Sequence, residues 1–464
     1  DLAPLGTGRR VVFALEGGQA TGPCTLALGE VLVHGSRAPA RTVLVITSDT
    51  HRGDHLGFRA STLDLATPTI DAIAARGVSF TRALASSPNT LPSHSALMTG
   101  QHPLELGMLS NYNRLSSGFE TLAERFAAAG YVTLAAASSR NLDHVGSGLG
   151  RGFDRYSAPD GALERPAAET LSALTGWLDE LGDAPVFVWL HFFDAHQPYD
   201  PPADLAPPLP DERNAETYRE WLKACYRAEI ESLDRELGTL LARDRFDTAV
   251  VCFTSDHGES LGGHGIDFDH ISVYPDVVHV PLLMAWPGAP KGERVDDLVQ
   301  QRDVARTVLE LAGLDANGFA GRPLLADRDP ADPVFALDAD ARSISITEGT
   351  LHLMLSLREH ELHPGSAENR TLVPRHRVEL YDLARDPEAL HDLSTERADD
   401  ARRLRAEVLA YLRRVPLRGE LQASKSEALI RDLEALGYAT PSVTGAGEAW
   451  FEDDCACEFC AAFE

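Results

Sequence analysis

The sequence predicts an α/β protein with a doubly wound sheet, followed by a smaller C-terminal α+β subdomain. Continuous β-branched runs such as TVLVITSD are typical of parallel strands that are buried on both faces. These runs alternate with amphipathic helical patterns, and this order favours the strand–helix–strand units of a doubly wound sheet. From about residue 328 the chain changes to short alternating strands and one charged helix, which indicates the second subdomain.

The elements of the core follow one another in a regular order. The first strand ends at Asp49, and a helix is expected in TPTIDAIAARG, with Thr67 as N-cap, Pro68 in the first helical position and Gly77 beyond the end. Three further pairs of helix and apolar strand follow. They are ETLAERFAAAGY before VTLAAAS, LSALTGWLDELG before APVFVWLHFFDAH, and YRAEIESLDRELGTLLAR before DTAVVCFTSDHGE.

These patterns divide the chain into four regions. Residues 1–40 are expected to hold short antiparallel strands, left over from a β-sandwich, and a linker. Residues 41–327 form the predicted catalytic core, 328–437 the α+β subdomain, and 438–464 a linker and a Cys-rich tail. Because the chain begins at Asp1 rather than Met, we expect a processed product or a part of a longer precursor; the sequence leaves the compartment open, with export to a bacterial periplasm or cell surface as one option.

The composition restricts the partners of this chain. It carries 70 acidic and 42 basic side chains, so its formal net charge is −28. No broad basic surface is available for a nucleic-acid polymer. No apolar run approaches the roughly 20 residues of a membrane span. A small anionic ester remains a suitable substrate if a metal supplies a local positive charge. The oligomeric state cannot be read from the sequence.

Carboxylates and imidazoles follow three of the predicted strands. They are Asp49 after the first, His191, Asp194 and His196 at the end of a middle strand, and Asp256 and His257 after the last. Because parallel strands of such a sheet place their carboxyl ends at one edge, we expect these groups to converge. A single Asp at a strand end is more often a helix cap, but three strand ends together favour a site for a divalent cation.

Several motifs occur in one order over about residues 41–400: TVLVITSDTHRGDHLG, SSPNTLPSHSALMTG, FFDAHQPYDPP, FTSDHGESLGGHG and VELYDLARDPEALHDLS. In this order the chain resembles a sulfatase-like member of the alkaline phosphatase superfamily, of the arylsulfatase and phosphonate monoester hydrolase type. The resemblance implies an alkaline-phosphatase-like α/β/α sandwich and an ester hydrolase. It further implies a metal held by Asp49, Thr90, Asp256 and His257, with Thr90 as the nucleophile that forms a covalent ester.

Further roles follow from the same resemblance. His196, and His270 after it, correspond to histidines that contact the substrate and would protonate the leaving group, although each could instead be a hydrogen-bonded loop histidine. Asn111 stands at a position that contacts a substrate oxygen. His94 stands in place of the motif arginine, so a bidentate anion clamp is lost, and His94 is expected to bind the substrate in its place. Thr90 is expected just before a helix that begins near Pro92–Ser93, where its hydroxyl could also be an N-cap without chemistry.

Threonine changes the chemistry that the motif implies. The family signature, C/S-x-P-S-R, begins with a Cys or Ser that is oxidised to formylglycine, and Thr90 could not yield that aldehyde. In this superfamily, threonine nucleophiles belong to phosphodiesterases, phosphonoacetate hydrolases and phosphoethanolamine or lipoteichoic transferases. We therefore expect cleavage of a phosphate ester, a phosphate diester or a phosphonate, without formylglycine. A sulfuric ester hydrolase and a non-catalytic anion-binding homologue are the alternatives.

One divalent cation is expected rather than two, because Asp194 and His196 do not have the D-x-x-x-H spacing of two-metal relatives. The imidazole ligand favours Zn²⁺ or Mn²⁺, with Ca²⁺ or Mg²⁺ as alternatives. Three cysteines, Cys455, Cys457 and Cys460, crowd the C-terminal tail. They could bind a soft metal or form a disulfide with one thiol left over. Since no fourth metal ligand is evident, we expect a disordered terminus there.

Overall fold

The computed structural model describes residues 41–59, 63–182, 184–212, 214–362, 371–415 and 457–461. All of them belong to one compact unit, His34–Glu464. The strands expected in residues 1–40 and the linker expected after Gly437 lie outside the described residues.

The core of this unit is an eight-stranded mixed sheet. From one edge to the other its strands are β10 (Glu293–Gln300), β2 (Val78–Leu84), β9 (His279–Ala285), β6 (Val250–Ser255), β1 (Val43–Ser48), β5 (Val186–Phe192), β3 (Val132–Ala137) and β4 (Arg155–Ser157). Neighbouring strands are parallel, except that β9 runs antiparallel to both β2 and β6. The predicted α/β class is confirmed. The antiparallel direction of β9 was not predicted, because a strand buried on both faces has the same apolar pattern in either direction.

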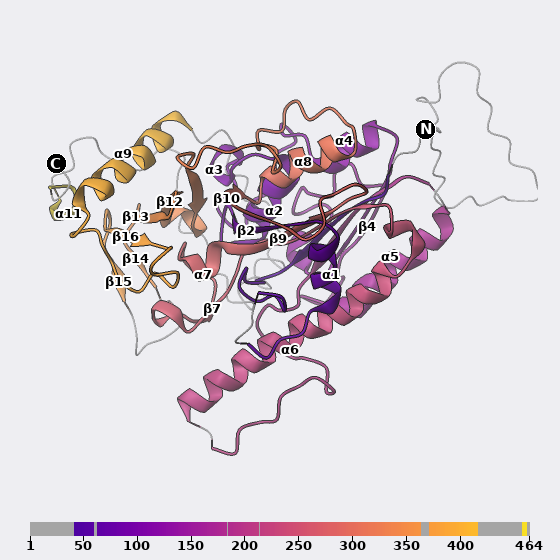
Figure 1. Cartoon of the computed structure of the whole chain (residues 1–464), viewed down its shortest axis with the longest axis horizontal. Helices are drawn as coiled ribbons and strands as arrows, with labels where there is room; N and C mark the ends of the chain where they lie inside the picture. The colour runs from indigo at the N-terminus through magenta and orange to yellow at the C-terminus, as the bar shows by residue number, and fades with distance from the viewer. Residues whose placement is uncertain are drawn as a thin grey trace, which may run out of the picture. The chain divides into compact units, whose positions relative to one another are not determined.

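Helices cover both faces of the sheet and make three layers (Figure 1). On one face α1 (Pro68–Arg76) and α5 (Ala167–Leu181) both contact the long α6 (Ala215–Leu241). On the other face α2 (Thr90–Thr99) contacts α3 (Pro103–Leu106), α4 (Leu122–Ala128) and α8 (Asp303–Leu311). Short elements in the loops are α7 (Pro275–Val278), the β7–β8 ribbon (Ser260–Leu261 and Asp267–Asp269), and 3-10 turns at Arg140–Leu142, Asp244–Phe246, Gly263–Gly265 and Ala339–Ala341.

Local sequence signals explain where helices begin. Helix α4 begins after a capping box, in which the Thr121 hydroxyl accepts the Glu124 N–H at 3.2 Å and the Glu124 carboxylate accepts the Thr121 N–H at 2.9 Å. Helix α1 begins at Pro68, as the sequence predicts, but its N-cap hydroxyl has another use. Thr67 Oγ1 accepts the N–H of Gly57 and donates to Asp71, so it ties the preceding loop to the helix.

The C-terminal subdomain is a four-stranded antiparallel sheet, as the α+β pattern predicts. Its order is β11 (Val334–Leu337), β12 (Ser343–Glu348), β13 (Leu351–Ser356) and β16 (Val378–Asp382), with β14 (His360–Glu361) and β15 (Leu372–Val373) as a separate pair. Helix α9 (Ala398–Arg414) packs on the sheet. The tail, expected to be disordered, contains the short helix α11 (Glu458–Ala461) within its described residues.

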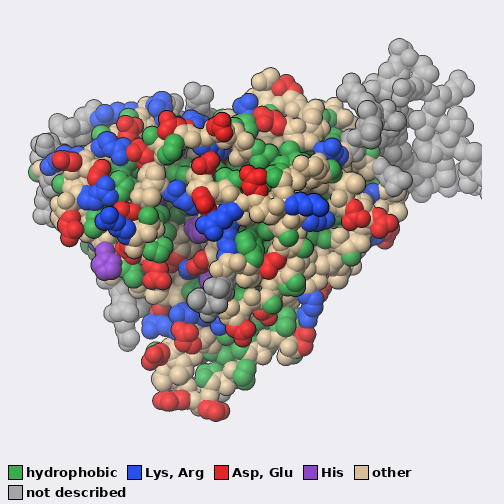
Figure 2. Space-filling model, viewed as in Figure 1, with side chains coloured by type: hydrophobic (Ala, Val, Ile, Leu, Met, Phe, Trp, Pro, Cys, Tyr) green, Lys and Arg blue, Asp and Glu red, His purple; other side chains and the backbone are tan. Residues whose placement is uncertain are grey.

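The surface and the helices bear on two predictions about partners. Figure 2 shows acidic and basic side chains interspersed on the visible face, so no continuous basic area is present on that face. Within the described residues, no helix combines the length and the apolar composition that crossing a membrane requires.

Candidate active site

Three adjacent central strands deliver the site residues to one edge of the sheet. Strand β1 lies between β5 and β6, and its last residue, Ser48, pairs with Phe192 on one side and Ser255 on the other. Asp49 and Asp256 are the next residues of their strands, so they leave the sheet at the same level. The register of the strands therefore brings together carboxylates that are about 200 residues apart in the chain.

Asp49, Asp256 and His257 form a compact, fully buried cluster. His257 Nε2 lies 3.7 Å from Asp49 Oδ1 and 3.5 Å from Asp256 Oδ2. The other ring nitrogen, Nδ1, lies 3.0 Å from the carbonyl oxygen of Gly258 and must donate to it, so the lone pair of Nε2 faces the carboxylates. Within the described residues these three facing atoms have no hydrogen-bond donor. Three buried acceptors that face one another fit a divalent cation.

The electrostatics of the cluster lead to the same conclusion. Burial raises the pKa of Asp49 to about 8, and burial together with the charge of Asp49 raises the pKa of Asp256 well above its ordinary value. Burial lowers the pKa of His257 well below its ordinary value, so the imidazole supplies no positive charge. A bound dication would supply the charge that two buried carboxylates require.

His191 orients one of the carboxylates. Its Nε2 lies 3.2 Å from Asp49 Oδ2, on the side of the carboxylate that faces away from His257. The ring is fully buried, and burial lowers its pKa to about 3, so it donates as a neutral imidazole. A hydrogen bond of this kind fixes the direction in which a carboxylate presents its other oxygen to a metal.

Thr90 is the first residue of α2 and is almost completely buried. The helix was expected to begin near Pro92–Ser93 but begins at Thr90, because Asn89 adopts the extended conformation of an N-cap and its carbonyl accepts the first helical hydrogen bond. Pro92 is compatible with this earlier start, since N–H groups of the first turn have no partner inside the helix. Ser93 Oγ donates to the carbonyl of Asp256 at 2.7 Å, which holds this turn beside the cluster.

His94, expected to bind the substrate, is instead directed at the backbone of Thr90 and at β1. It is fully buried, and its Nδ1 donates to the Thr90 carbonyl at 2.7 Å. Its Nε2 lies 3.0 Å from the hydroxyl of Thr47 on β1. Both ring nitrogens are therefore used within the protein, which makes His94 a residue that positions Thr90.

Asn111 presents an amide group beside the start of α2. Its Oδ1 accepts the N–H of Leu91 at 2.8 Å, so the side chain lies next to Thr90. Its Nδ2 is buried and makes no hydrogen bond with the described residues. A buried donor without an acceptor is costly unless a ligand uses it, and this orientation suits an oxygen of an anionic substrate.

His196 and His270 extend a row of imidazoles away from His257. The ring centroids of His257 and His270 are 4.4 Å apart, and those of His270 and His196 are 5.3 Å apart. His270 Nδ1 donates to the carbonyl of Pro88 at 2.8 Å, just before α2. His196 Nδ1 donates to the carbonyl of Gln197, and burial lowers the pKa of His196 to about 3.

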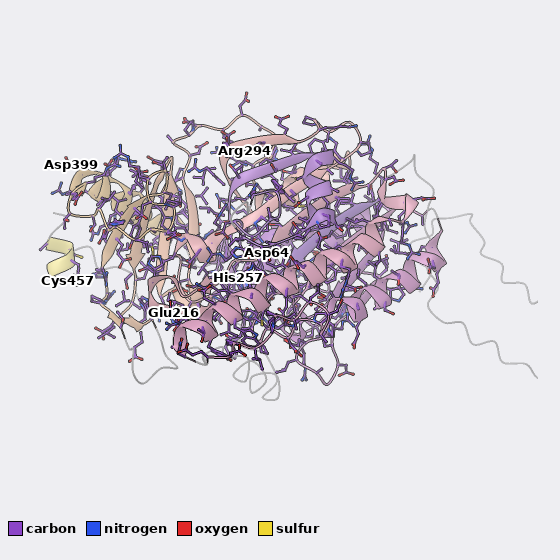
Figure 3. The ribbon with its side chains drawn as sticks, turned by 60° about the horizontal axis from the view of Figure 1, so that its bottom comes forward. Asp64, Glu216, His257, Arg294, Asp399 and Cys457 are labelled. Atoms are coloured by element: carbon purple, nitrogen blue, oxygen red, sulfur yellow. The ribbon has the colours of Figure 1, made fainter. Side chains whose placement is uncertain are left out.

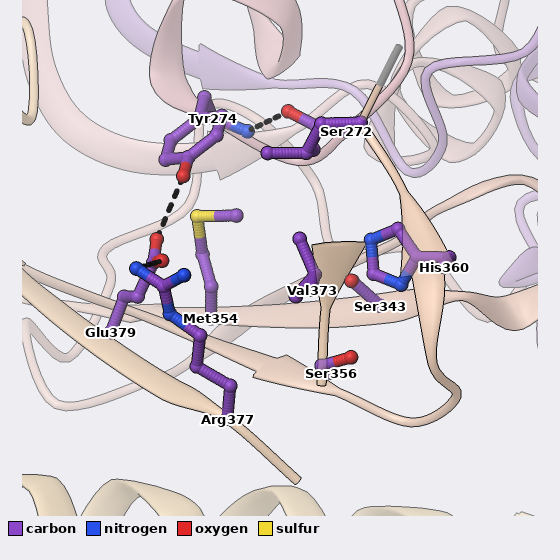
Figure 4. Close-up of a pocket in the computed structure, with 10 residues that line it drawn as sticks. Ser272, Tyr274, Ser343, Met354, Ser356, His360, Val373, Arg377 and Glu379 are labelled. Carbon is purple, nitrogen blue, oxygen red and sulfur yellow. Dashed lines mark hydrogen bonds and ion pairs between the residues drawn. The ribbon is translucent and has the colours of Figure 1, made fainter. Parts of the chain in front are cut away.

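The C-terminal subdomain supports the segment that carries His270. The Tyr274 hydroxyl donates to Glu379 on β16 at 2.8 Å, across a small pocket between this segment and the sheet (Figure 4). His352 Nε2 on β13 donates to the carbonyl of Val273 at 3.0 Å. The smaller sheet thus contributes to the site through hydrogen bonds that position residues 270–274.

Sequence reasoning missed three residues around the cluster. Thr50 has a positive φ of 53°, and its N–H donates to Asp256 Oδ1 at 3.3 Å. The Tyr226 hydroxyl, from α6, donates to the Thr50 carbonyl at 2.7 Å. Glu259 is 1% exposed, and burial raises its pKa well above the ordinary value. Its position two residues after His257 was the only signal for Glu259, while nothing in the sequence around Tyr226 connected it with the site.

Comparison with protein families identifies this arrangement. A family model described as Sulfatase matches residues 41–314, more than half of the chain. The chain belongs to the sulfatase family. Members of this family are metal-dependent, and the buried Asp and His cluster agrees with that property. The predicted class of enzyme, an ester hydrolase, agrees with the membership.

Individual relatives are distant in sequence. An ulvan-active sulfatase of Formosa agariphila is 26% identical over 329 residues, which cover 61% of this chain and 64% of that protein. The chain therefore spans less than two thirds of the length of this relative.

Solved structures resemble this chain over most of its length. A phosphonate monoester hydrolase of Agrobacterium radiobacter superposes with a TM-score of 0.60 at 22% sequence identity. The match covers 81% of this chain and 95% of that protein. A 2-O GAG sulfatase superposes with a TM-score of 0.65 at 21% sequence identity, and the match covers 88% of this chain and 99% of that protein. At these identities the likeness concerns the fold, and it confirms the alkaline-phosphatase-like architecture.

Proposed function

We propose that this chain hydrolyses phosphate diesters or phosphonate monoesters through a covalent ester on Thr90. The proposal rests on Thr90, which by the resemblance stands where the family has its nucleophile, and which is the first residue of α2, a helix whose Ser93 hydrogen-bonds to Asp256. Its Cβ methyl prevents conversion to the formylglycine aldehyde, so an unmodified hydroxyl must attack. Phosphonate monoester hydrolases among the proteins of similar fold are compatible with this chemistry.

Two displacement steps account for the reaction. In the first, a bond forms between Thr90 Oγ1 and phosphorus and the bond to the leaving alkoxide breaks; the proton of Thr90 passes to solvent, and the alkoxide takes a proton from protonated His196. In the second, water attacks phosphorus and the bond to Thr90 breaks; neutral His196 takes the proton of that water, and the oxygen of Thr90 takes a proton from solvent. A divalent cation held by Asp49, Asp256 and His257 would lower the pKa of the Thr90 hydroxyl and offset the charge of the phosphoryl oxygens.

The surrounding residues of the chain have separate tasks. Asn111 donates from Nδ2 to a non-bridging oxygen beside the start of α2, where the positive end of the helix dipole favours an anion. His94 fixes the carbonyl of Thr90 and hence the direction of its side chain. His196, with His270 beside it, gives the leaving alkoxide a proton. An anionic ester next to a neutral imidazole raises the pKa of its ring, which counteracts the effect of burial.

A sulfuric ester hydrolase is the second candidate, because the curated relatives include an ulvan-active sulfatase. This reaction would also use the cation and the imidazoles. A non-catalytic anion-binding protein is disfavoured, since the buried, mutually facing acceptor atoms of Asp49, Asp256 and His257 are all retained.

One set of assays separates these three functions. Metal-loaded protein would be tested with aryl esters that share one leaving group: a phosphate monoester, a phosphate diester, a phosphonate and a sulfate. We expect the diester or the phosphonate to have the highest kcat/KM, Thr90→Ala to lose turnover, and Thr90→Ser to retain part of it. Mass spectrometry of the peptide with residue 90 should show an unmodified threonine. A preference for the sulfate ester would instead support a sulfatase, and full activity of Thr90→Ala would disprove the nucleophile.

The same protein tests the cofactor. Elemental analysis should find a divalent metal, with Zn²⁺ or Mn²⁺ favoured over Ca²⁺ or Mg²⁺, and Asp256→Ala should lose both the metal of this site and the activity. An Asp256→Ala protein that keeps full activity would show that the site is misplaced.

A further inference from the structure

A second cluster of potential metal ligands lies in the C-terminal subdomain, apart from the active site. It consists of His376, Cys457 and Cys460. Figure 3 shows Cys457 at one end of the unit, well separated from His257. His376 lies in the turn before β16 with a positive φ of 70°, while Cys457 and Cys460 belong to the tail, more than 80 residues later. Folding therefore joins the tail cysteines to a histidine that the sequence does not connect with them.

The geometry of the three side chains is that of a metal site. The Sγ atoms of Cys457 and Cys460 lie 3.4 and 3.3 Å from the same atom, His376 Nδ1. In a tetrahedral zinc site with usual bond lengths, sulfur and nitrogen ligands are about 3.6 Å apart. A proton on Nδ1 can point at only one of the two sulfurs, whereas a metal ion between them would contact all three atoms.

The surroundings favour thiolates, which are the form that binds metal. Arg405 Nη2, from α9, lies 3.2 Å from Cys460 Sγ. The N–H of Cys460 points at Cys457 Sγ at 3.4 Å. A guanidinium group and a backbone N–H both stabilise negative charge on sulfur. His376 and Cys460 are buried, with 2% and 4% of their surfaces exposed, so an ion between these side chains would be shielded from bulk water.

We propose that His376, Cys457 and Cys460 bind a zinc ion that fastens the C-terminal tail to the β16 and α9 side of the subdomain. The C-x-x-C spacing and the histidine supply three of the four ligands of a structural zinc site, and water or a further ligand completes it. Binding releases the two thiol protons as the sulfurs coordinate. This site contains no residue of the active site and is independent of the proposed function.

Cobalt substitution tests the proposal directly, because only a thiolate-bound Co²⁺ gives an intense sulfur-to-cobalt charge-transfer band in the near ultraviolet. The full chain would be purified under reducing conditions, stripped of metal and titrated with Co²⁺ and then Zn²⁺. We expect the band in the wild type and in Asp256→Ala, its loss in Cys457→Ser, and at least about 10-fold weaker cobalt binding in His376→Gln. Zinc should displace the cobalt and abolish the band.

Matched variants control for indirect effects. His391→Gln changes an exposed histidine of the same subdomain, and Cys225→Ser changes a buried cysteine of the core, so both should keep the band. Circular dichroism checks that each variant is folded. The proposal is overturned if the wild type gives no band, or if Cys457→Ser keeps it. If the purified protein contains a Cys457–Cys460 disulfide and the reduced protein gives no cobalt band, the proposal is also overturned.

Discussion

At the scale of single residues, the site is defined by polar atoms that are buried before any ligand is present. Asp49, Asp256 and His257 turn acceptors toward one another, and Asn111, whose Oδ1 accepts an N–H of α2, keeps a buried Nδ2 donor that has no acceptor among the described residues. A folded protein normally pairs such groups, because each unpaired one costs about 1–3 kcal/mol. The cost is consistent with a site in which the cation and the anion of an ester complete the hydrogen bonds and charge balance.

Asn111 allows this interpretation to be tested with a nearly isosteric change. In Asn111→Asp, an oxygen can still accept the Leu91 N–H, but the Nδ2 donor is lost and a negative charge is added beside the anion. We expect kcat/KM for the best substrate to fall by about 10²–10³-fold, as for removal of a transition-state donor, while the thermal midpoint of unfolding changes little. Steady-state kinetics of wild type and variant would measure this effect. An unchanged kcat/KM would show that Asn111 only supports α2.

The sequence revealed the residues that follow strands better than the residues that surround them. Asp49, Asp256 and His257 could be found because a buried parallel strand has a visible apolar pattern and its end must lie at the binding edge. Tyr226 could not, because its helix contacts the site through tertiary packing alone. His376 was missed for the same reason, since its cysteine partners lie in a separate part of the chain.

At the scale of elements, the loop after β6 is held at a fixed distance from α7. Gly258 donates its N–H to Val277 at 2.6 Å, and a Cβ atom at Gly258 would lie only 2.3 Å from the carbonyl oxygen of Asp276. No side chain fits between these two backbones. Gly258 therefore allows the close packing that fixes the position of the adjacent His257. The order of strands and loops alone would not fix that position.

Gly258→Ala should for this reason damage metal binding more than stability of the sheet. The extra methyl group must push the loop away from α7 and move His257 from Asp49 and Asp256. We expect metal affinity to fall by at least about 10-fold, as for a change that misorients a ligand. Isothermal titration with Zn²⁺ or Mn²⁺ would measure it. Gly176→Ala, within α5 and with open space for the methyl group, is the control and should leave affinity unchanged. Equal affinity in both variants would refute this role of Gly258.

At the scale of the whole molecule, buried neutral histidines make folding sensitive to acid. His102 is fully buried at the start of α3, where Nδ1 accepts the Leu104 N–H at 3.3 Å and Nε2 donates to the Phe335 carbonyl at 3.3 Å. Both contacts require the neutral ring. Burial lowers its pKa from 6.5 to about 3. His352, which supports residues 270–274 from the other sheet, has its pKa lowered by burial to about 4.

The direction of the resulting pH dependence follows from proton binding. Below pH 6.5 His102 binds a proton in the unfolded chain but not in the folded protein. The contribution of the neutral His102 ring to the free energy of unfolding is therefore fully present above pH 6.5 and is lost progressively as the pH falls toward about 3. One such histidine contributes at most about 1.4 kcal/mol per pH unit.

His102→Asn keeps a capping acceptor for α3 but cannot ionise. Its free energy of unfolding should therefore fall less steeply than that of the wild type between pH 6.5 and 5, where carboxylates contribute least. Urea unfolding at a series of pH values would measure both slopes, and the exposed His391→Asn should keep the wild-type slope. Equal slopes for His102→Asn and wild type would mean that the ring at position 102 becomes protonated without leaving its place, and the acid sensitivity would then have to come from other groups.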